Sequence, residues 1–217
     1  CFMKITEIRC ICTGRINSEI FRHSADLQEM VDASVRTGKV FTVHQNRRWD
    51  EDYRTLKYMY DHNTLGKPFR IESRVHGSRG IPGDWRNKKE CGGGMVLDWG
   101  VHLLDQIMQM INKPVISIYS ELSYVTNENC DDGFRTTLIF DDGLSFYVEV
   151  TTSNFIELPL WYVLGENGTA VVNDWQWNGK IVKVSDWENR DAVPVVTAAG
   201  LTKTMAPRTE DTIQTYP

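Results

Sequence analysis

The helix-forming stretch after Cys91 holds the residues of this chain best suited to proton chemistry. Three glycines, 92–94, lead directly into it, and Asp98, His102 and Asp105 follow at positions i, i+4 and i+7. This spacing places the three side chains on one face of a helix. A carboxylate one turn from an imidazole can orient the ring and raise its basicity, and histidine titrates near neutral pH. The pattern predicts a proton-handling pair, with a purely structural pair as the competing interpretation.

The same helix must also be anchored in a core. A second face carries apolar side chains at helical spacing and is expected to pack on the rest of the protein: Leu97, Val101, Leu104 and Met108. The three preceding glycines permit close backbone approach and unusual dihedral angles, which favours a functional interpretation of the loop. The polar, glycine-rich segment 77–93 is long for a connection inside one domain, and such loops are often functional.

Composition excludes several classes of function. The formal net charge of −5 argues against nucleic acid and anionic membranes as partners, because such surfaces bind clustered cations. The chain has no apolar run of the length of a membrane span, and Lys4, Glu7 and Arg9 interrupt its amino end, so we expect neither a span nor a secretory signal. Five cysteines without paired metal-ligand spacing predict reduced thiols, no metal site and a cytoplasmic location.

The first third of the chain predicts helices alternating with strands. Ser24 and Asp50 are placed to cap two amphipathic helices. The helices are expected over 25–37 and 51–62, and strands over 3–12, 40–45 and 69–76.

The remainder reads as a series of short strands separated by turns. Asp-Gly and Asn-Gly pairs favour the hairpin turns that match strand twist. The expected strands cover 116–126, 134–140, 144–152, 160–164, 170–173 and 181–184. Consecutive hairpins would build an open, largely antiparallel sheet with the earlier helices on one face, which is an α+β fold. From Asn189 onward the pattern decays and predicts an irregular tail.

Several motifs, in the right order, resemble the glucose–fructose oxidoreductase/inositol dehydrogenase (Gfo/Idh/MocA) family. Segment 93–105 is similar to its GG-x-x-x-D-x-G-x-H-x-x-D signature, and 43–50 to the segment that closes its nucleotide domain. Residues 65–71 resemble its entry into the substrate-side sheet, and Asp84-Trp85-Arg86 resembles its Trp-Arg loop. The resemblance covers roughly residues 24–185.

This resemblance implies an NAD(P)-dependent dehydrogenase that moves hydride between the nicotinamide and a sugar or cyclitol carbon. It implies a Rossmann domain and a dihydrodipicolinate-reductase-like carboxy-terminal domain whose sheet mediates homo-oligomerisation. His102 would be the general base or acid on the reacting hydroxyl, and Asp98 would orient or hydrogen-bond the substrate. Arg47, Trp85 and Arg86 would border the substrate pocket, and the cofactor would be NAD or NADP.

The chain departs from the family pattern towards its amino end. No G-x-G-x-x-G turn follows a strand, and Asn17-Ser18-Glu19 stands about where the family carries its catalytic lysine. We therefore expect a remnant helix and strand of the nucleotide domain over 1–48, a substrate and oligomerisation domain over 49–188, and an irregular tail over 189–217. Such a chain alone is expected to be inactive or weakly active and to bind little or no cofactor, and its cofactor-binding residues are unknown.

Three functions stay open at this level. The first is an oxidoreductase acting on a small sugar-like or polyol substrate, and the second is a non-catalytic sheet domain that oligomerises or binds a sugar. The third is a metal hydrolase using Asp98, His102 and a further histidine, His44 or His76; it is disfavoured because catalytic zinc needs three protein ligands at suitable spacing. Trp99 and Trp161 are expected in the core or an interface.

Overall fold

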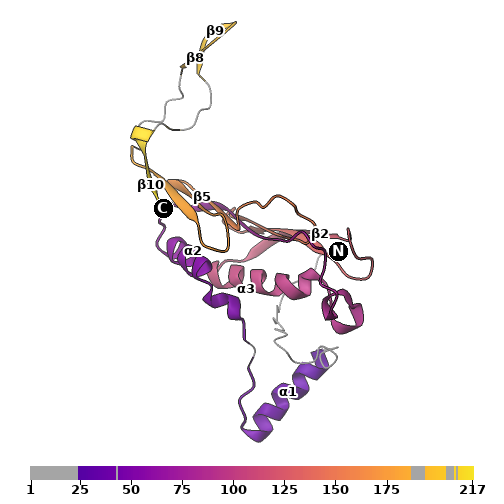
Figure 1. Ribbon diagram of the computed structural model, residues 1–217. Coiled ribbons are helices and arrows are strands. Elements are labelled where there is room, and N and C mark those ends of the chain that lie inside the picture. Colours follow the sequence, from indigo (N-terminus) through magenta and orange to yellow (C-terminus); the bar gives the residue numbers. More distant parts are fainter. Residues whose placement is uncertain (1–23, 43, 187–193, 204–207, 209) are drawn as a thin grey trace.

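The computed structural model describes residues 24–42, 44–186, 194–203, 208 and 210–217. Its centre is an eight-stranded sheet with two helices packed against one face (Figure 1). The strand order is β10-β7-β6-β5-β1-β4-β3-β2. The strands are β1 (Pro68–His76), β2 (Val115–Ser123), β3 (Gly133–Phe140), β4 (Ser145–Thr151), β5 (Trp161–Gly165), β6 (Gly168–Val172), β7 (Gly179–Val184) and β10 (Ile213–Tyr216).

One row of paired residues shows why this sheet forms. On the helix-covered face the paired residues are Leu138, Phe146, Ile71, Val163 and Ala170, from five adjacent strands. All five are buried, with exposed fractions of 0–7%. The next row, on the opposite face, is largely polar: Thr137, Tyr147, Glu72, Tyr162 and Val171. This alternation is typical of a sheet with one packed face and one open face.

Two helices supply the apolar cover. Helix α2 (Glu51–Asp61) buries Tyr53, Leu56 and Met59. Helix α3 (Val101–Met110), preceded by the five-residue π turn η5 (Val96–Gly100), buries Leu103, Ile107 and Met110. Together they close the core over the central strands.

The core-facing side of α3 differs from the expected one. Leu97 and Met108, at the two ends of the predicted stripe, are 50% and 42% exposed, whereas Leu104 in its middle packs against the core. The helix carries two apolar stripes, and contacts of its polar face with segment 45–48 favour the rotation that buries Leu103 and Ile107.

The α+β fold, the second helix and the strands from β1 to β7 confirm the prediction to within a few residues. The consecutive-hairpin prediction was wrong at one place. Strand β1 lies between β4 and β5, pairing parallel with β4 and antiparallel with β5. Turn signals report local pairing only, and they carry no information about a strand inserted from earlier in the chain.

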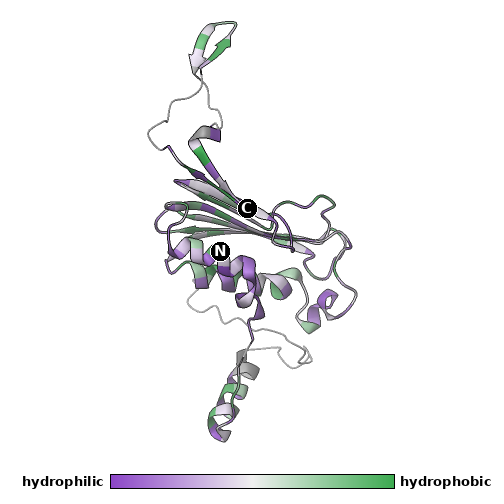
Figure 2. Ribbon diagram, turned by 60° about the vertical axis from the view of Figure 1, so that its left-hand side comes forward, coloured by the Kyte–Doolittle hydropathy of each residue, from purple (hydrophilic) through white to green (hydrophobic). Residues whose placement is uncertain are grey.

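The secondary structure predicted for the amino-terminal segment is confirmed only in part. Helix α1 (Ser24–Thr37) forms and stands apart from the sheet in both views, with Val35 79% exposed (Figures 1 and 2). Residues 40–42 and 44–45 form no strand, because a strand needs a neighbour to satisfy its backbone groups and the described residues offer none there. The strand expected over 3–12 lies outside the described residues.

The carboxy-terminal segment is more regular than expected. Strands β8 (Pro194–Thr197) and β9 (Gly200–Lys203) form a hairpin that projects from the body, and β10 adds to the sheet beside β7 (Figure 1). The weak apolar pattern concealed both, because a projecting hairpin and an edge strand bury little.

Candidate active site

Two residues of the glycine loop lie so close to neighbouring atoms that no side chain could be accommodated there. A Cβ on Gly93 would lie 2.3 Å from the Arg86 carbonyl oxygen, and one on Gly94 would lie 2.1 Å from Asp131 Oδ1. Gly94 also has a φ of +107°, which L-residues with side chains rarely adopt. Asp131 Oδ2 accepts a hydrogen bond from the Val96 backbone N–H at 2.8 Å. The loop and Asp131 together fix where the π turn begins.

The π turn directs Asp98 towards the loop that precedes the glycines. Arg86 Nε donates to Asp98 Oδ2 at 2.8 Å, and Arg86 Nη1 donates to Asp84 Oδ2 at 2.8 Å. Short π segments inside helices are frequent at functional sites. Asp98 is therefore held by one of its oxygens, which leaves the other able to accept from a ligand.

His102 is held by a different partner. Its Nδ1 lies 2.9 Å from Gln45 Oε1, and among the described residues no hydrogen bond joins Asp98 to His102. Because an amide oxygen only accepts, this contact places the imidazole proton on Nδ1 and leaves Nε2 with a lone pair.

The electrostatic surroundings keep His102 neutral. Burial and the nearby Arg47 guanidinium lower the pKa of His102 below its ordinary value of 6.5, against the opposing effect of Asp98 and other carboxylates. A neutral imidazole at pH 7 is the form able to accept a proton.

Asp105 anchors the segment that carries Gln45. Arg48 grips its carboxylate with two hydrogen bonds, Nε to Oδ2 at 2.7 Å and Nη2 to Oδ1 at 2.6 Å. Gln106 Nε2 adds a bond to the Arg47 carbonyl oxygen at 2.7 Å. The predicted polar face of the helix is confirmed, and Asp98, His102 and Asp105 each bind a different partner.

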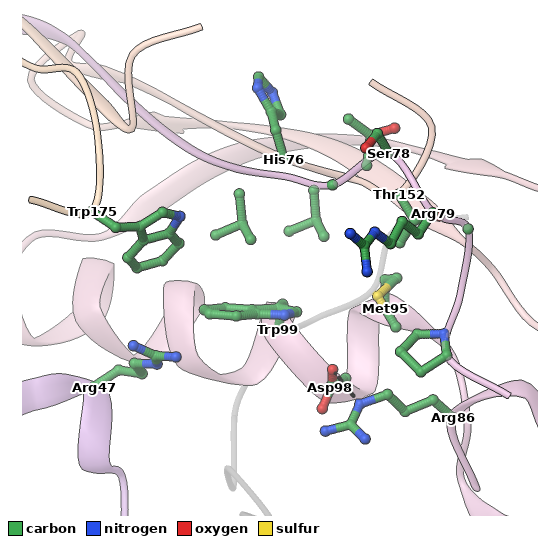
Figure 3. Close-up of a pocket in the computed structure, with 16 residues that line it drawn as sticks. Arg47, His76, Ser78, Arg79, Arg86, Met95, Asp98, Trp99, Thr152 and Trp175 are labelled. Atoms are coloured by element: carbon green, nitrogen blue, oxygen red, sulfur yellow. Dashed lines mark hydrogen bonds and ion pairs between the residues drawn. The ribbon is translucent and has the colours of Figure 1, made fainter. Parts of the chain in front are cut away.

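A cavity of about 640 Å³ opens beside Asp98 (Figure 3). Trp99 and Trp175 form an aromatic wall, with ring centroids 5.9 Å apart and an interplanar angle of 46°. The Arg47 guanidinium carbon lies 4.6 Å from the Trp99 centroid and 5.6 Å from that of Trp175. The ends of β1 and β4 and the loop after β1 supply the remaining walls. Cavities that combine aromatic walls with polar groups able to orient a ligand are typical of small-molecule sites.

The predicted site residues divide around this cavity. Asp98, Arg47 and Arg86 line it. His102 does not line it but packs edge-on against Trp99, which does, with ring centroids 6.2 Å apart. Trp85 does not line it either; the Arg86 guanidinium carbon lies 4.7 Å from the centroid of its ring.

Other residues of the site were missed by the sequence prediction. Trp99, expected in the core or an interface, packs against the core and also lines the cavity, whereas Trp161 is buried with its Nε1 donating to Asp52 Oδ2 at 2.8 Å. Gln45 and Trp175 had no role assigned. An aromatic residue in the polar β6–β7 connection was the available signal for Trp175, since loops often carry binding residues.

The metal hydrolase receives no support. Within the ranges that the structure describes, no group of three or more His, Cys, Asp or Glu side chains is arranged to hold a metal ion. His76 lies instead beside Glu149, with 3.6 Å between Nε2 and Oε2.

The described helices include none with the length and apolar character that crossing a membrane requires.

Comparison with known proteins decides the family. Residues 53–171, more than half of the chain, match the GFO/IDH/MocA C-terminal domain. The chain belongs to the Gfo/Idh/MocA family. This family comprises NAD(P)-dependent oxidoreductases of sugars and cyclitols.

Individual relatives agree with this assignment. A crystal structure of an NAD-binding protein from Listeria innocua is 48% identical, with a TM-score of 0.78, over 88% of this chain and 56% of that protein. The D-glucoside 3-dehydrogenase of Escherichia coli is 24% identical over 67% of this chain and 44% of that enzyme. The scyllo-inositol 2-dehydrogenase (NADP(+)) of Bacillus subtilis is 26% identical over 49% of this chain and 30% of that enzyme.

This Gfo/Idh/MocA chain spans only part of its relatives. It covers 23–44% of the length of the curated proteins it matches. The residues that match the family model include strands β1 to β5, most of β6 and the Asp98–His102 helix.

Proposed function

We propose that this chain supplies the substrate side of an NAD(P)-dependent dehydrogenase that acts on a hydroxyl of a sugar or cyclitol. The proposal is supported by the placement of Asp98 in the cavity wall, one turn from a neutral His102 that packs directly behind the cavity residue Trp99. The names of the matched glucoside and inositol dehydrogenases support this substrate class.

Each residue would have a distinct role. His102 Nε2 would take the proton of the reacting hydroxyl, because Nδ1 is already committed to Gln45. Asp98, with Oδ2 fixed on Arg86, would orient that hydroxyl through its other oxygen. The apolar face of a sugar ring would lie against Trp99 and Trp175, and Arg47 and Arg86 would bind further hydroxyls. Trp85 would act only by supporting Arg86.

The dinucleotide itself does not fit the described residues. Gly94 is packed against the Asp131 carboxylate, which would repel a phosphate. The other glycines of the loop do not form the turn between strand and helix of a phosphate-binding βαβ unit. In the family reaction the nicotinamide accepts the hydride, and residues other than those described would have to hold NAD or NADP. The described residues would therefore bind and orient the substrate and take its proton.

We also propose that the chain forms a homo-oligomer through its sheet and works in the cytoplasm. The described helices that pack on the sheet cover one of its faces (Figure 1). The other face and the β2 edge expose large side chains, among them Tyr119 and Ile116. Replacing Tyr119 with Glu should shift the sedimentation mass towards the monomer, because an unpaired charge is costly in an interface. Tyr58→Glu, on the outer side of α2, is the matched control. An unchanged mass for Tyr119→Glu would remove the sheet from the interface.

The dehydrogenase proposal is tested by two titrations of the chain. Sugars and cyclitols should quench tryptophan fluorescence through Trp99 and Trp175, and this response should weaken in Asp98→Asn. NADH and NADPH should produce little change in nicotinamide fluorescence at the same protein concentration. Absence of any response to sugars and cyclitols would contradict the proposal. Sugar binding that is indifferent to Asp98 would instead favour the non-catalytic sheet domain.

A further inference from the structure

The cavity beside Asp98 has a cationic wall that the proposed proton chemistry does not use. Three arginines line the cavity, Arg47, Arg79 and Arg86, against one carboxylate, Asp98. Arg47 forms an ion pair with Asp50 at 3.2 Å, and Arg86 forms ion pairs with Asp84 and Asp98, both at 2.8 Å. Within the described part of the chain, Arg79 has no ion pair. It therefore brings an uncompensated positive charge to the cavity.

The backbone around Arg79 is fixed. The Gly77 N–H donates to the Thr151 carbonyl oxygen at 2.8 Å, and the Gly80 N–H donates to the Thr152 carbonyl oxygen at 2.9 Å. Gly80 has a φ of +73°, and a Cβ there would lie 3.0 Å from Thr126 Oγ1, so the turn requires glycine. These contacts attach the loop to the end of β4 on both sides of Arg79, so little backbone entropy is lost when Arg79 binds a ligand.

The Arg79 side chain points into the cavity. Figure 3 shows the Arg79 guanidinium turned into the cavity, on the opposite side from Trp175, with Trp99 between them. A ligand that lies against the aromatic wall therefore extends towards a guanidinium group. That group is planar and presents paired donors that match a carboxylate or a phosphate.

We propose that the substrate of this site carries a negatively charged group, a carboxylate or a phosphate, which Arg79 binds while the sugar ring lies against Trp99 and Trp175. The substrate class is then an acidic sugar derivative rather than a neutral polyol. The inference rests on the proposed function in that it takes this cavity as the substrate site. Because Arg79 is exposed, the interaction is expected to improve affinity by about tenfold and to weaken as salt rises.

The test is a set of equilibrium titrations of the full chain without cofactor, followed by tryptophan fluorescence and calorimetry. The probes are D-glucuronate, D-glucose 6-phosphate and the neutral methyl D-glucoside, each at low and high salt. We expect at least one anionic probe to bind about tenfold more tightly than the neutral one at low salt. Arg79→Gln should abolish this preference, and Arg79→Lys should restore part of it. Arg54→Gln removes an exposed arginine of α2 outside the cavity and should change nothing.

The outcomes separate the possibilities. Preference for glucuronate alone identifies a carboxylate, and preference for the phosphate alone identifies a phosphate, provided that Arg79→Gln removes it. Equal binding of neutral and anionic probes, or a preference that survives in Arg79→Gln, overturns the inference. Because no turnover is measured, an Arg79-dependent preference would stand even if hydride transfer were never observed. Equally, Asp98-dependent binding of the neutral sugar without that preference would keep the proposed function and remove only this inference.

Discussion

Gln45 Oε1 and His102 Nδ1 lie 2.9 Å apart, although 57 residues separate them in the chain. This contact fixes the orientation of the imidazole and selects the tautomer whose Nε2 can accept a proton. The Arg48–Asp105 ion pair, three residues further along each segment, holds the two segments together. The segment before α2 is thus a positioning element for the histidine.

Replacing Gln45 with Glu should raise the pKa of His102, because a carboxylate beside the ring stabilises the imidazolium. NMR titration of the His102 ring protons measures this directly, without turnover. The wild-type midpoint should lie below 6.5, since burial and Arg47 lower this pKa. Gln45→Leu provides the control that removes the hydrogen bond without adding charge. A midpoint that is the same in wild type and Gln45→Glu would contradict the contact.

The same pKa shift has a consequence for stability. His102 has a lower pKa folded than unfolded, so the unfolded chain binds more protons as pH falls through the unfolded value of about 6.5. The free energy of unfolding should therefore decrease as pH falls below that value. Urea unfolding of wild type and His102→Ala across this range should show a shallower dependence in the variant. Identical slopes would mean that His102 titrates alike in both states.

Gly94→Ala should destabilise the protein more than Gly143→Ala. Both glycines have positive φ, +107° and +86°, so both variants strain the backbone. Only Gly94 would also place its Cβ against Asp131, whereas Gly143 faces open space. We expect a difference of about 1–3 kcal/mol in the free energy of unfolding, measured in urea. Equal losses would show that the glycine loop is required for its dihedral angles alone.

Trp175→Ala should weaken sugar binding by about tenfold, because it removes one half of the aromatic wall. Trp177→Ala is the matched control: it lies in the same connection, is 55% exposed against 43% for Trp175, and does not line the cavity. Calorimetric titration with methyl D-glucoside measures both. If the two variants bind alike, the ring does not stack on Trp175.

The sequence was informative where structure is local. Alternation of apolar and polar residues located β1 to β7, because each strand has one packed face and one open face. Helical spacing placed Asp98, His102 and Asp105 on one polar face, and the motif resemblance led to Arg47 and Arg86 at the cavity.

Long-range relationships could not be read in this way. The insertion of β1 between β4 and β5 depends on pairing between residues 75 positions apart, which no turn signal encodes. The partners of the polar face, Gln45, Arg48 and Arg86, come from two distant segments. Which apolar side chains of α3 are most deeply buried follows from those partners, so the prediction placed the helix and its polar face but missed Leu103, Ile107 and Met110 as the core residues.

The central claim, that the Asp98–His102 helix performs the proton chemistry of a sugar or cyclitol dehydrogenase, is tested most directly in a fusion. This chain would replace the matched segment of the Listeria innocua NAD-binding protein, which is 48% identical to it. With NAD binding verified by nicotinamide fluorescence, reduction of NAD is followed over neutral and acidic sugars and cyclitols. We expect the fusion to reduce NAD and its rate to fall by about 10²–10⁴-fold in His102→Ala. If the fusion binds NAD and a sugar but forms no NADH, or if His102→Ala leaves the rate unchanged, His102 is not the proton acceptor of such a reaction.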